Sequence, residues 1–267
     1  MSLSQYAKNV TSQFGEDGII AEIIKIIGDD IAKYCVEFGA WDGKHLSNTW
    51  SLVHDHGWGV CYIESVRQRY LSLKQRHSRN SKVTTINALV TDSSVPDTSL
   101  SALLRKARVP ESIGLVSIDI DGNDYHVWRD FHGFKVDVVV IEYNYTIPPD
   151  VEYVDEGGKA FMGSSALALV NLAKSKGYSL VACTITNCIF VRKELYPKFN
   201  IADNSVDVLM PREGLTFVAR NFAGEVVFSS KAVLGPMIGF IGYRRLRKWI
   251  KLLLRWKKSF RYLGEKY

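Results

Sequence analysis

Residues 34–43 read YCVEFGAWDG, a short run of mostly apolar residues that ends at Phe38 and passes through Gly39 into a loop. Valine and aromatic residues favour strands, and a glycine lets the backbone turn sharply where a strand ends. Short apolar runs of the same kind recur along the chain, such as GVCYIE at 59–64 and VDVVVIEYN at 136–144. The stretch therefore predicts the first strand of a sheet that is covered on both faces.

Segments with helical character separate these strands. Strands are expected at 34–38, 59–64, 82–90, 113–121, 136–144, 178–184 and 187–192. Helices are expected at 16–33, 67–79, 100–106, 124–131 and 165–177. This alternation predicts βαβ units and an α/β fold with a Rossmann-like, doubly wound sheet. The last two strands are joined too closely for a crossover helix, so they are expected to pair antiparallel.

The alternation stops near Lys198, and the charge pattern changes further on. We expect a domain at 1–198, a poorly periodic extension at 199–236 and a tail at 237–267. The tail holds ten Lys or Arg and one acidic residue, a net charge of +9, so the rest of the chain carries −3 of the total of +6. A mildly acidic body argues against nucleic acid as a partner.

The tail has the pattern of a basic amphipathic helix. Its apolar residues recur at helical spacing, for example Leu246, Trp249, Ile250 and Leu253, and most of its Lys and Arg lie off that stripe. This pattern is typical of a helix lying on an anionic membrane surface. A helix that packs on the body or on a second subunit, in a homo-oligomer, is the alternative.

The four cysteines and the N-terminus bear on localisation. The cysteines contain no CxxC pair and lie mostly in apolar runs, which indicates buried free thiols in a reducing compartment. The N-terminus has no basic stretch followed by an apolar core, and no uncharged apolar run reaches the ~18 residues of a membrane span. We expect a cytoplasmic protein, peripheral at the inner membrane face if the tail binds lipid.

Polar side chains mark the carboxyl ends of four of the seven expected strands, where open α/β sheets bind ligands. These residues are Glu37, Glu64, Asp119, Asp121, Glu142 and Asn144. Acids are depleted in strands, so the set favours a ligand over helix capping. Gly39 would let the backbone approach that ligand, and Glu64 would accept both hydroxyls of a ribose. The loop after the first strand is not G-x-G-x-x-G, and an acid-rich pocket suits a cationic sulfonium better than a dinucleotide.

Several segments in this order resemble the class I S-adenosylmethionine-dependent methyltransferases, and among them the FkbM-type O-methyltransferases. The segments are SQFGEDGI (12–19), VEFGAWDG (36–43), INALV (86–90) and SIDIDGND (117–124). The resemblance covers about 12–192 and implies a seven-stranded sheet with an antiparallel last strand and methyl transfer to an oxygen. It implies that S-adenosylmethionine is held by Glu37, Gly39, Gly43, Glu64, Ala88 and Asp119.

The stretch Asp119-Ile-Asp121-Gly-Asn-Asp-Tyr125 is also similar to the cation-dependent caffeoyl-CoA and catechol O-methyltransferases. This resemblance implies a site for Mg²⁺ or another divalent cation, with oxygen ligands from Asp119, Asp121, Glu142 and Asn144. Asp119 and Asp121 would share one face of their strand by its alternation. The lysine of that family is replaced by Gly122, so His126 is our candidate base. In the alternative without a metal, Asp121 or His126 takes the proton.

These observations predict an S-adenosylmethionine-dependent O-methyltransferase acting on a small-molecule or glycan acceptor, specifically a sugar hydroxyl. Two alternatives stay open. One is an NAD(P)-dependent oxidoreductase on a similar sheet, and the other is a non-catalytic scaffold recruited to membranes.

Overall fold

The computed structural model describes residues 2–157, 163–212, 217–228 and 260–262, which belong to two compact units. The first unit comprises Met1–Asn144 and Pro149–Met210, and the second comprises Tyr145–Pro148 and Pro211–Tyr267. The first unit contains the expected sheet and helices.

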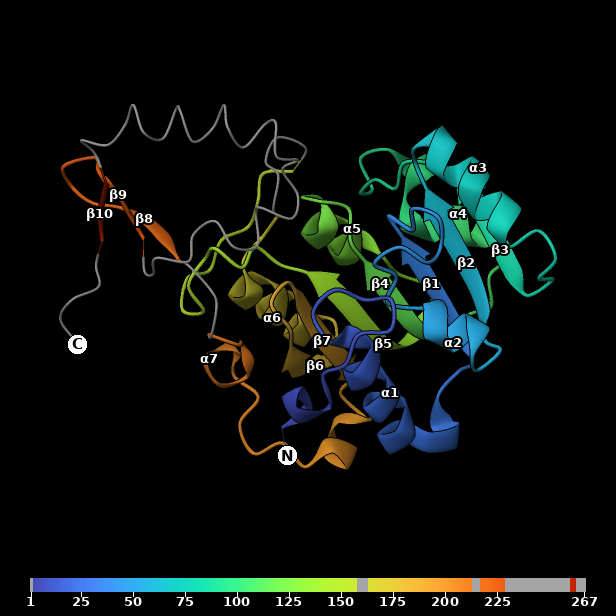
Figure 1. The fold of residues 1–267 in the computed structure, drawn as a ribbon, viewed down its shortest axis with the longest axis horizontal. Helices are drawn as coiled ribbons and strands as arrows, with labels where there is room; N and C mark the ends of the chain where they lie inside the picture. The colour runs from blue at the N-terminus through green and yellow to red at the C-terminus, as the bar shows by residue number, and fades with distance from the viewer. Residues whose placement is uncertain (1, 158–162, 213–216, 229–259, 263–267) are drawn as a thin grey trace. The chain divides into compact units, whose positions relative to one another are not determined.

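The strands and helices of the first unit follow the alternation seen in the sequence (Figure 1). Its strands are β1 (Tyr34–Phe38), β2 (Gly59–Glu64), β3 (Val83–Asn87), β4 (Ser112–Ile118), β5 (Lys135–Glu142), β6 (Tyr178–Cys183) and β7 (Asn187–Arg192). Its α-helices are α1 (Glu16–Ile27), α2 (Trp50–His54), α3 (Arg67–Arg76), α4 (Leu100–Lys106), α5 (Asp124–Asp130), α6 (Ala166–Ser175) and α7 (Val206–Leu209). Short 3₁₀ turns are η1 (Leu3–Tyr6), η2 (Gly28–Asp30), η3 (Pro96–Thr98) and η4 (Tyr196–Phe199).

The seven strands form one sheet in the order β3-β2-β1-β4-β5-β7-β6. Strands β1 to β5 are parallel to one another, whereas β7 runs antiparallel to both β5 and β6. This topology confirms the predicted fold class of the domain, a doubly wound seven-stranded sheet with an antiparallel last strand. The strand order reverses between β1 and β4, which places the switch point of the sheet there.

Both faces of the sheet are covered, as its apolar strands require. On one face, α1 contributes Ile19, Ile20, Ile23 and Ile27, spaced as one side of a helix, to the core that also includes Ile189 of β7. On the other face, Trp128 of α5 packs against Phe190, with ring centroids 5.1 Å apart. Because adjacent strand residues point to opposite faces, Ile189 and Phe190 together connect both layers.

The first unit continues past Lys198, where the sequence suggested that the domain ends. Phe199 of η4, Val206 of α7 and Met210 are all buried. Lys198 also donates from Nζ to the carbonyl oxygen of Ile27 at 2.8 Å, which ties η4 to the end of α1. The expected extension at 199–236 therefore begins as part of the first unit.

The second unit contains a small sheet in the order β10-β9-β8, formed by β8 (Val218–Arg220), β9 (Val226–Phe228) and β10 (Phe260–Tyr262). Strands β8 and β9 are antiparallel, and β10 is parallel to β9. Most of the amphipathic helix predicted at 237–267 lies outside the described residues. The prediction is wrong for Phe260–Tyr262, whose backbone pairs with β9 instead of continuing a helix.

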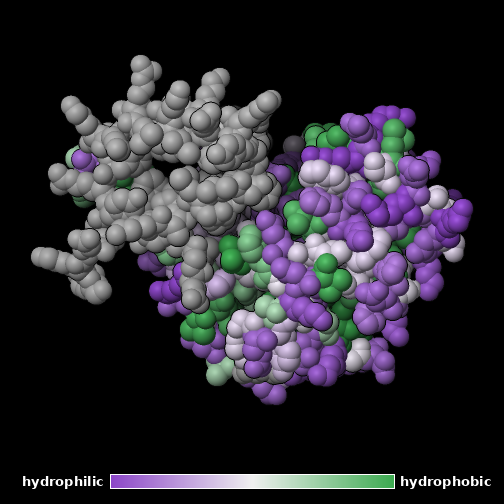
Figure 2. Space-filling model, viewed as in Figure 1, coloured by the Kyte–Doolittle hydropathy of each residue, from purple (hydrophilic) through white to green (hydrophobic). Residues whose placement is uncertain are grey.

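Within the described ranges, none of the helices combines the length and the hydropathy that crossing a membrane requires. Hydrophilic side chains predominate on the face of the first unit shown in Figure 2, including the region of α3.

Candidate functional site

The segments that follow β1 and β4 contact each other at the switch point of the sheet. Gly39 follows β1 with φ +74°, and a Cβ built on it would overlap the carbonyl oxygen of Asp119, which follows β4. Only glycine combines this backbone conformation with such a close approach. The two strand exits thus lie against each other at the carboxyl edge of the sheet, where sheets of this type bind ligands in a crevice.

Glu37, at the end region of β1, is buried and fully engaged by the loop that precedes α2. One carboxylate oxygen accepts hydrogen bonds from Ser47 Oγ and Thr49 Oγ1, both at 2.6 Å, and the other accepts from Asn48 N at 2.9 Å. Burial raises the pKa of Glu37, against the opposing effect of these donors. The structure therefore places Glu37 as the anchor of the 47–49 loop.

Glu64, the last residue of β2, holds two backbone segments. Its carboxylate accepts from Trp41 N at 2.8 Å and from Val66 N at 2.7 Å, and the residue is 2% exposed. Each carboxylate oxygen has a second lone pair, so Glu64 retains acceptor capacity for a ribose. The sequence anticipated the acid but not its two backbone partners.

Residues after β1 and β3 supply apolar surface near Glu64. Ala88 and Leu89 follow β3, and Leu89 is 63% exposed. Gly43 has φ +75°, and a Cβ there would lie 2.5 Å from Nε2 of His77. Trp41 is 41% exposed, and the Arg69 guanidinium lies 3.6 Å from the centroid of its ring.

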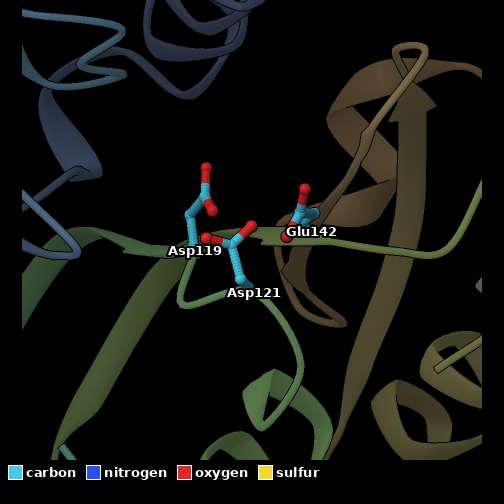
Figure 3. A group of neighbouring side chains, drawn as sticks. All are labelled: Asp119, Asp121 and Glu142. Carbon is cyan, nitrogen blue, oxygen red and sulfur yellow. The ribbon is translucent and has the colours of Figure 1, made fainter. Parts of the chain in front are cut away.

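Three carboxylates from the ends of β4 and β5 converge beyond the switch point (Figure 3). Asp119, Asp121 and Glu142 each present an oxygen, and these oxygens lie within 4.8 Å of one another. The fourth expected ligand, Asn144, donates its backbone N–H to the carbonyl oxygen of Ser164 at 2.9 Å. The geometry thus brings together the three carboxylates among the four predicted ligands.

The convergence of Asp119 and Asp121 does not arise from strand alternation, so that part of the prediction is wrong. Strand β4 ends at Ile118, and Asp121 has φ +56° in a turn. The carboxylate of Asp124 holds this turn by accepting from Ile120 N and Gly122 N, both at 2.9 Å. A tight turn, rather than a pleated strand, aims both side chains at Glu142.

The proximity of these carboxylates raises the pKa of Asp119 and Glu142. Desolvation of its carboxylate and the charges of Asp124 and Asp121 raise the pKa of Asp119 to about 8. Asp119 is exposed on one side, so repulsion between carboxylates is the cause that we consider dominant. Burial and the charge of Asp119 raise the pKa of Glu142 well above its ordinary value. A cation entering the group would relieve this repulsion.

The donor set fits a hard divalent cation. All three groups offer oxygen, and Glu142 Oε2 is buried without a hydrogen-bond partner. Oxygen ligands lie about 2.0–2.6 Å from Mg²⁺ or Ca²⁺, so any two of them are at most about 4–5 Å apart, and oxygens within 4.8 Å of one another are close enough to reach one ion. These residues could therefore hold such an ion.

His126 lies on α5, and both of its ring nitrogens have partners. Its Nε2 is 2.6 Å from the carbonyl oxygen of Asp155, and its Nδ1 is 3.0 Å from Nη1 of Arg129. A carbonyl only accepts and a guanidinium only donates, so Nε2 carries the hydrogen and Nδ1 accepts. Within the part of the chain that the structure describes, His126 is not in the carboxylate group.

Two further buried acids, Glu16 and Asp17, connect the start of α1 to other segments of the chain. One oxygen of Asp17 accepts from Val10 N, Thr11 N and Ser12 N at 2.7–2.8 Å. Glu16 accepts from Thr184 Oγ1 at 2.6 Å, which ties α1 to the β6–β7 turn. Segment 12–19 contributes to the family resemblance, but its residues alone do not indicate these hydrogen-bond partners.

A hollow of about 310 Å³ opens beside the loop after β1. It is lined by Thr11, Asp42, Lys44, His45 and Leu46. Two backbone supports shape its wall, because Asp42 accepts from Lys44 N and His45 N at 3.0 and 2.8 Å.

No protein-family model matches the chain, and none of the curated proteins matches it. Among solved structures, it is similar to TrmK of M. capricolum in complex with S-adenosyl-homocysteine, with 11% identity, a TM-score of 0.40 and coverage of 64% of this chain and 65% of that one. It is similar to the N-terminal domain of EvdMO1 in the presence of S-adenosyl-homocysteine and D-fucose, with 11% identity, a TM-score of 0.43 and coverage of 66% and 80%.

A third similar structure is a putative sarcosine dimethylglycine methyltransferase from Galdieria sulphuraria, with 12% identity, a TM-score of 0.39 and coverage of 62% of each chain. The chain thus spans slightly less than two thirds of the length of TrmK and of the Galdieria protein. The first two of these structures contain S-adenosyl-homocysteine and the third is named as a methyltransferase, and similarity at this level assigns no function by itself.

Proposed function

We propose that the protein is an S-adenosylmethionine-dependent O-methyltransferase that acts on a sugar hydroxyl of a glycan or glycoside. The main support is the distribution of side chains along the carboxyl edge of the sheet. Acids lie at the ends of β1, β2 and β5 and just beyond β4, whereas β3 is followed by the apolar pair Ala88 and Leu89. This order of acidic and apolar surfaces along the edge of the sheet matches a nucleoside that bears a sulfonium and an ammonium.

In this proposal, the cofactor lies along the β1, β2 and β3 exits. Gly39 leaves room for its amino-acid end, in a loop shaped by Glu37 and Gly43. The free lone pairs of Glu64 accept the ribose hydroxyls, and Ala88 with Leu89 contacts the adenine. Asp119 faces the same crevice from β4. The cofactor supplies an activated methyl group, so the protein has only to align the acceptor oxygen and accept its proton.

The acceptor would lie above β4 and β5, beside the three converging carboxylates. Asp119, Asp121 and Glu142 would hold a divalent cation, which lowers the pKa of a coordinated hydroxyl when it is bound. Asn144 stays a proposed fourth ligand. Neighbouring hydroxyls of a sugar could both approach such an ion, which favours a diol as acceptor.

The proton acceptor that the geometry favours is Asp121. It is exposed toward the crevice, whereas His126 uses Nε2–H on Asp155 and Nδ1 on Arg129. His126 would have to break one of these contacts to act as a base. We therefore place His126 second.

Calorimetry with S-adenosylhomocysteine and with NADH tests the cofactor. We expect binding of the first and none of the second, because strand-end carboxylates repel a pyrophosphate. Glu64→Gln removes a charged acceptor worth about 1.5–3 kcal/mol, so the Kd for S-adenosylhomocysteine should rise roughly ten- to hundred-fold. Glu194→Gln is the matched control, because that side chain is 71% exposed. Binding of NADH alone would support the oxidoreductase instead.

Transfer of a labelled methyl group to simple glycosides tests the reaction. Activity that disappears in EDTA and returns with Mg²⁺ or Mn²⁺ supports the metal site. Full activity after chelation would leave Asp121 as a base without metal. Binding of S-adenosylhomocysteine without transfer to any acceptor tried would favour the scaffold.

A further inference from the structure

Two of the four cysteines face each other across the β6–β7 hairpin. Cys183 is the last residue of β6, Cys188 is the second residue of β7, and the two are direct partners in the antiparallel register. Their sulfurs are 3.8 Å apart, and both side chains are buried.

The backbone around this pair suits a cross-strand disulfide. Thr184 N donates to the carbonyl oxygen of Asn187 at 2.8 Å, so the hydrogen-bonded position lies just beyond the cysteines. The cysteines therefore occupy a non-hydrogen-bonded position, where facing Cα atoms are about 4.5 Å apart. Disulfides span Cα separations of about 4.4–6.8 Å, so the bond needs a movement of the sulfurs and little movement of the strands.

We propose that Cys183 and Cys188 form a reversible redox site that a small disulfide oxidises. The thiolate of Cys183 attacks one sulfur of the small disulfide, which forms a mixed disulfide and releases one small thiol. The thiolate of Cys188 then attacks the Cys183 sulfur and releases the second small thiol. The two protein thiols lose two electrons and two protons, and one small disulfide is reduced to two thiols.

The position of the pair in the sheet sets it apart from the other two cysteines. Strand β6 is an edge strand, whereas Cys35 and Cys61 lie on β1 and β2 inside the sheet. Cys35 pairs with Val60 and Cys61 pairs with Val36, so these two thiols are not opposite each other. Edge strands open more readily than central ones, so an oxidant reaches the β6–β7 pair first.

The exchange is slow, because the Cys188 thiol rarely ionises at its buried position. Burial raises the pKa of Cys188 well above its ordinary value, and the neighbouring Cys183 adds to the effect. Oxidation therefore requires opening of the hairpin edge and has to be followed to equilibrium over hours.

The pair also lies next to contacts that reach the crevice. Thr184 Oγ1 and Asn187 Nδ2 both donate to Glu16 Oε1, at 2.6 and 3.1 Å. Tyr143 donates from its hydroxyl to the carbonyl oxygen of Thr184 at 2.9 Å. A disulfide at the base of this turn would fix the segment that holds α1 and the end of β5.

Peptide mapping of the full chain tests the proposal. The protein is equilibrated in buffers with different ratios of oxidised to reduced glutathione, free thiols are alkylated in denaturant, and trypsin is added. Lys176 and Arg192 bound one tryptic peptide, 177–192, that contains both cysteines, while Cys35 and Cys61 fall in separate peptides. We expect peptide 177–192 to lose two hydrogens and its alkylation as the ratio rises, with Cys35 and Cys61 still alkylated.

The proposal is overturned if both cysteines of peptide 177–192 are alkylated at every ratio, or if they carry only glutathione. It is also overturned if Cys35 and Cys61 are oxidised in parallel, because that indicates global unfolding. Cys183→Ser should abolish the loss of two hydrogens, and Cys35→Ser should leave it unchanged. The measurement needs no activity, so it stands apart from the proposed function.

Discussion

Replacing Gly39 by alanine tests whether the contact between the β1 and β4 exits shapes the crevice. Gly39 has φ +74°, which costs an alanine about 1–2 kcal/mol. The added Cβ would overlap the carbonyl oxygen of Asp119, and a backbone atom can yield only if the chain shifts. Overpacking of this kind costs about 1–3 kcal/mol. We therefore expect Gly39→Ala to lose about 2–5 kcal/mol in free energy of unfolding.

Guanidinium denaturation followed by tryptophan fluorescence measures this loss, and calorimetry with S-adenosylhomocysteine measures its effect on binding. Gly177→Ala is the control, because Gly177 has φ +79° with nothing within 4 Å of an added Cβ. The Gly177→Ala variant should lose only the free energy of unfolding that the positive φ costs, about 1–2 kcal/mol, and should bind S-adenosylhomocysteine normally. Equal losses in the two variants, or unchanged binding by folded Gly39→Ala, would refute the reasoning.

Three other predictions concern Asp17, Asp119 and the C-terminal tail. Asp17→Ala leaves three backbone N–H groups without their acceptor and should destabilise the protein by about 2–4 kcal/mol in denaturation, while exposed Asp29→Ala should change little. The raised pKa of Asp119 means that the wild type loses stability as pH rises from about 4 to about 8. In EDTA, the denaturation midpoint of Asp119→Asn relative to that of the wild type should therefore be higher at pH 8.5 than at pH 5. The same difference between the two proteins at both pH values would contradict this. A chain ending at Gly235 should bind S-adenosylhomocysteine but no longer sediment with anionic vesicles. If the shortened chain unfolds, or if the full chain does not bind such vesicles at low salt, the tail is not a membrane-binding helix.

The sequence predicted the order and type of the elements closely because their signals are local. Apolar runs such as 59–64 and the isoleucines of α1 are readable from periodicity alone, and both occur as expected. The strand ends were less accurate, since β3 stops at Asn87 and β4 at Ile118. A turn can carry the same apolar and acidic residues as a strand end, so composition does not locate the last paired residue.

For the candidate site, the sequence indicated the types of residue but not their hydrogen-bond partners. The sequence indicated acids at the carboxyl edge, and Asp119, Asp121 and Glu142 do come together. It did not reveal that Glu37 is occupied by the 47–49 loop or that Asp124 holds the turn after β4. Those partners lie on other segments or depend on the path of a turn, so no pattern in the neighbouring residues shows them.

By itself, the sequence therefore determined the α/β alternation, the antiparallel closing pair and the kinds of groups at the sheet edge. These features follow from the periodicity of burial and from chain connectivity, which the order of residues carries directly. Only the tertiary structure decided which carboxylates face the crevice, which ones hold backbone, and that His126 is engaged by Asp155 and Arg129. Such choices depend on hydrogen-bond partners brought together by packing across distant parts of the chain, as when Thr184 reaches Glu16.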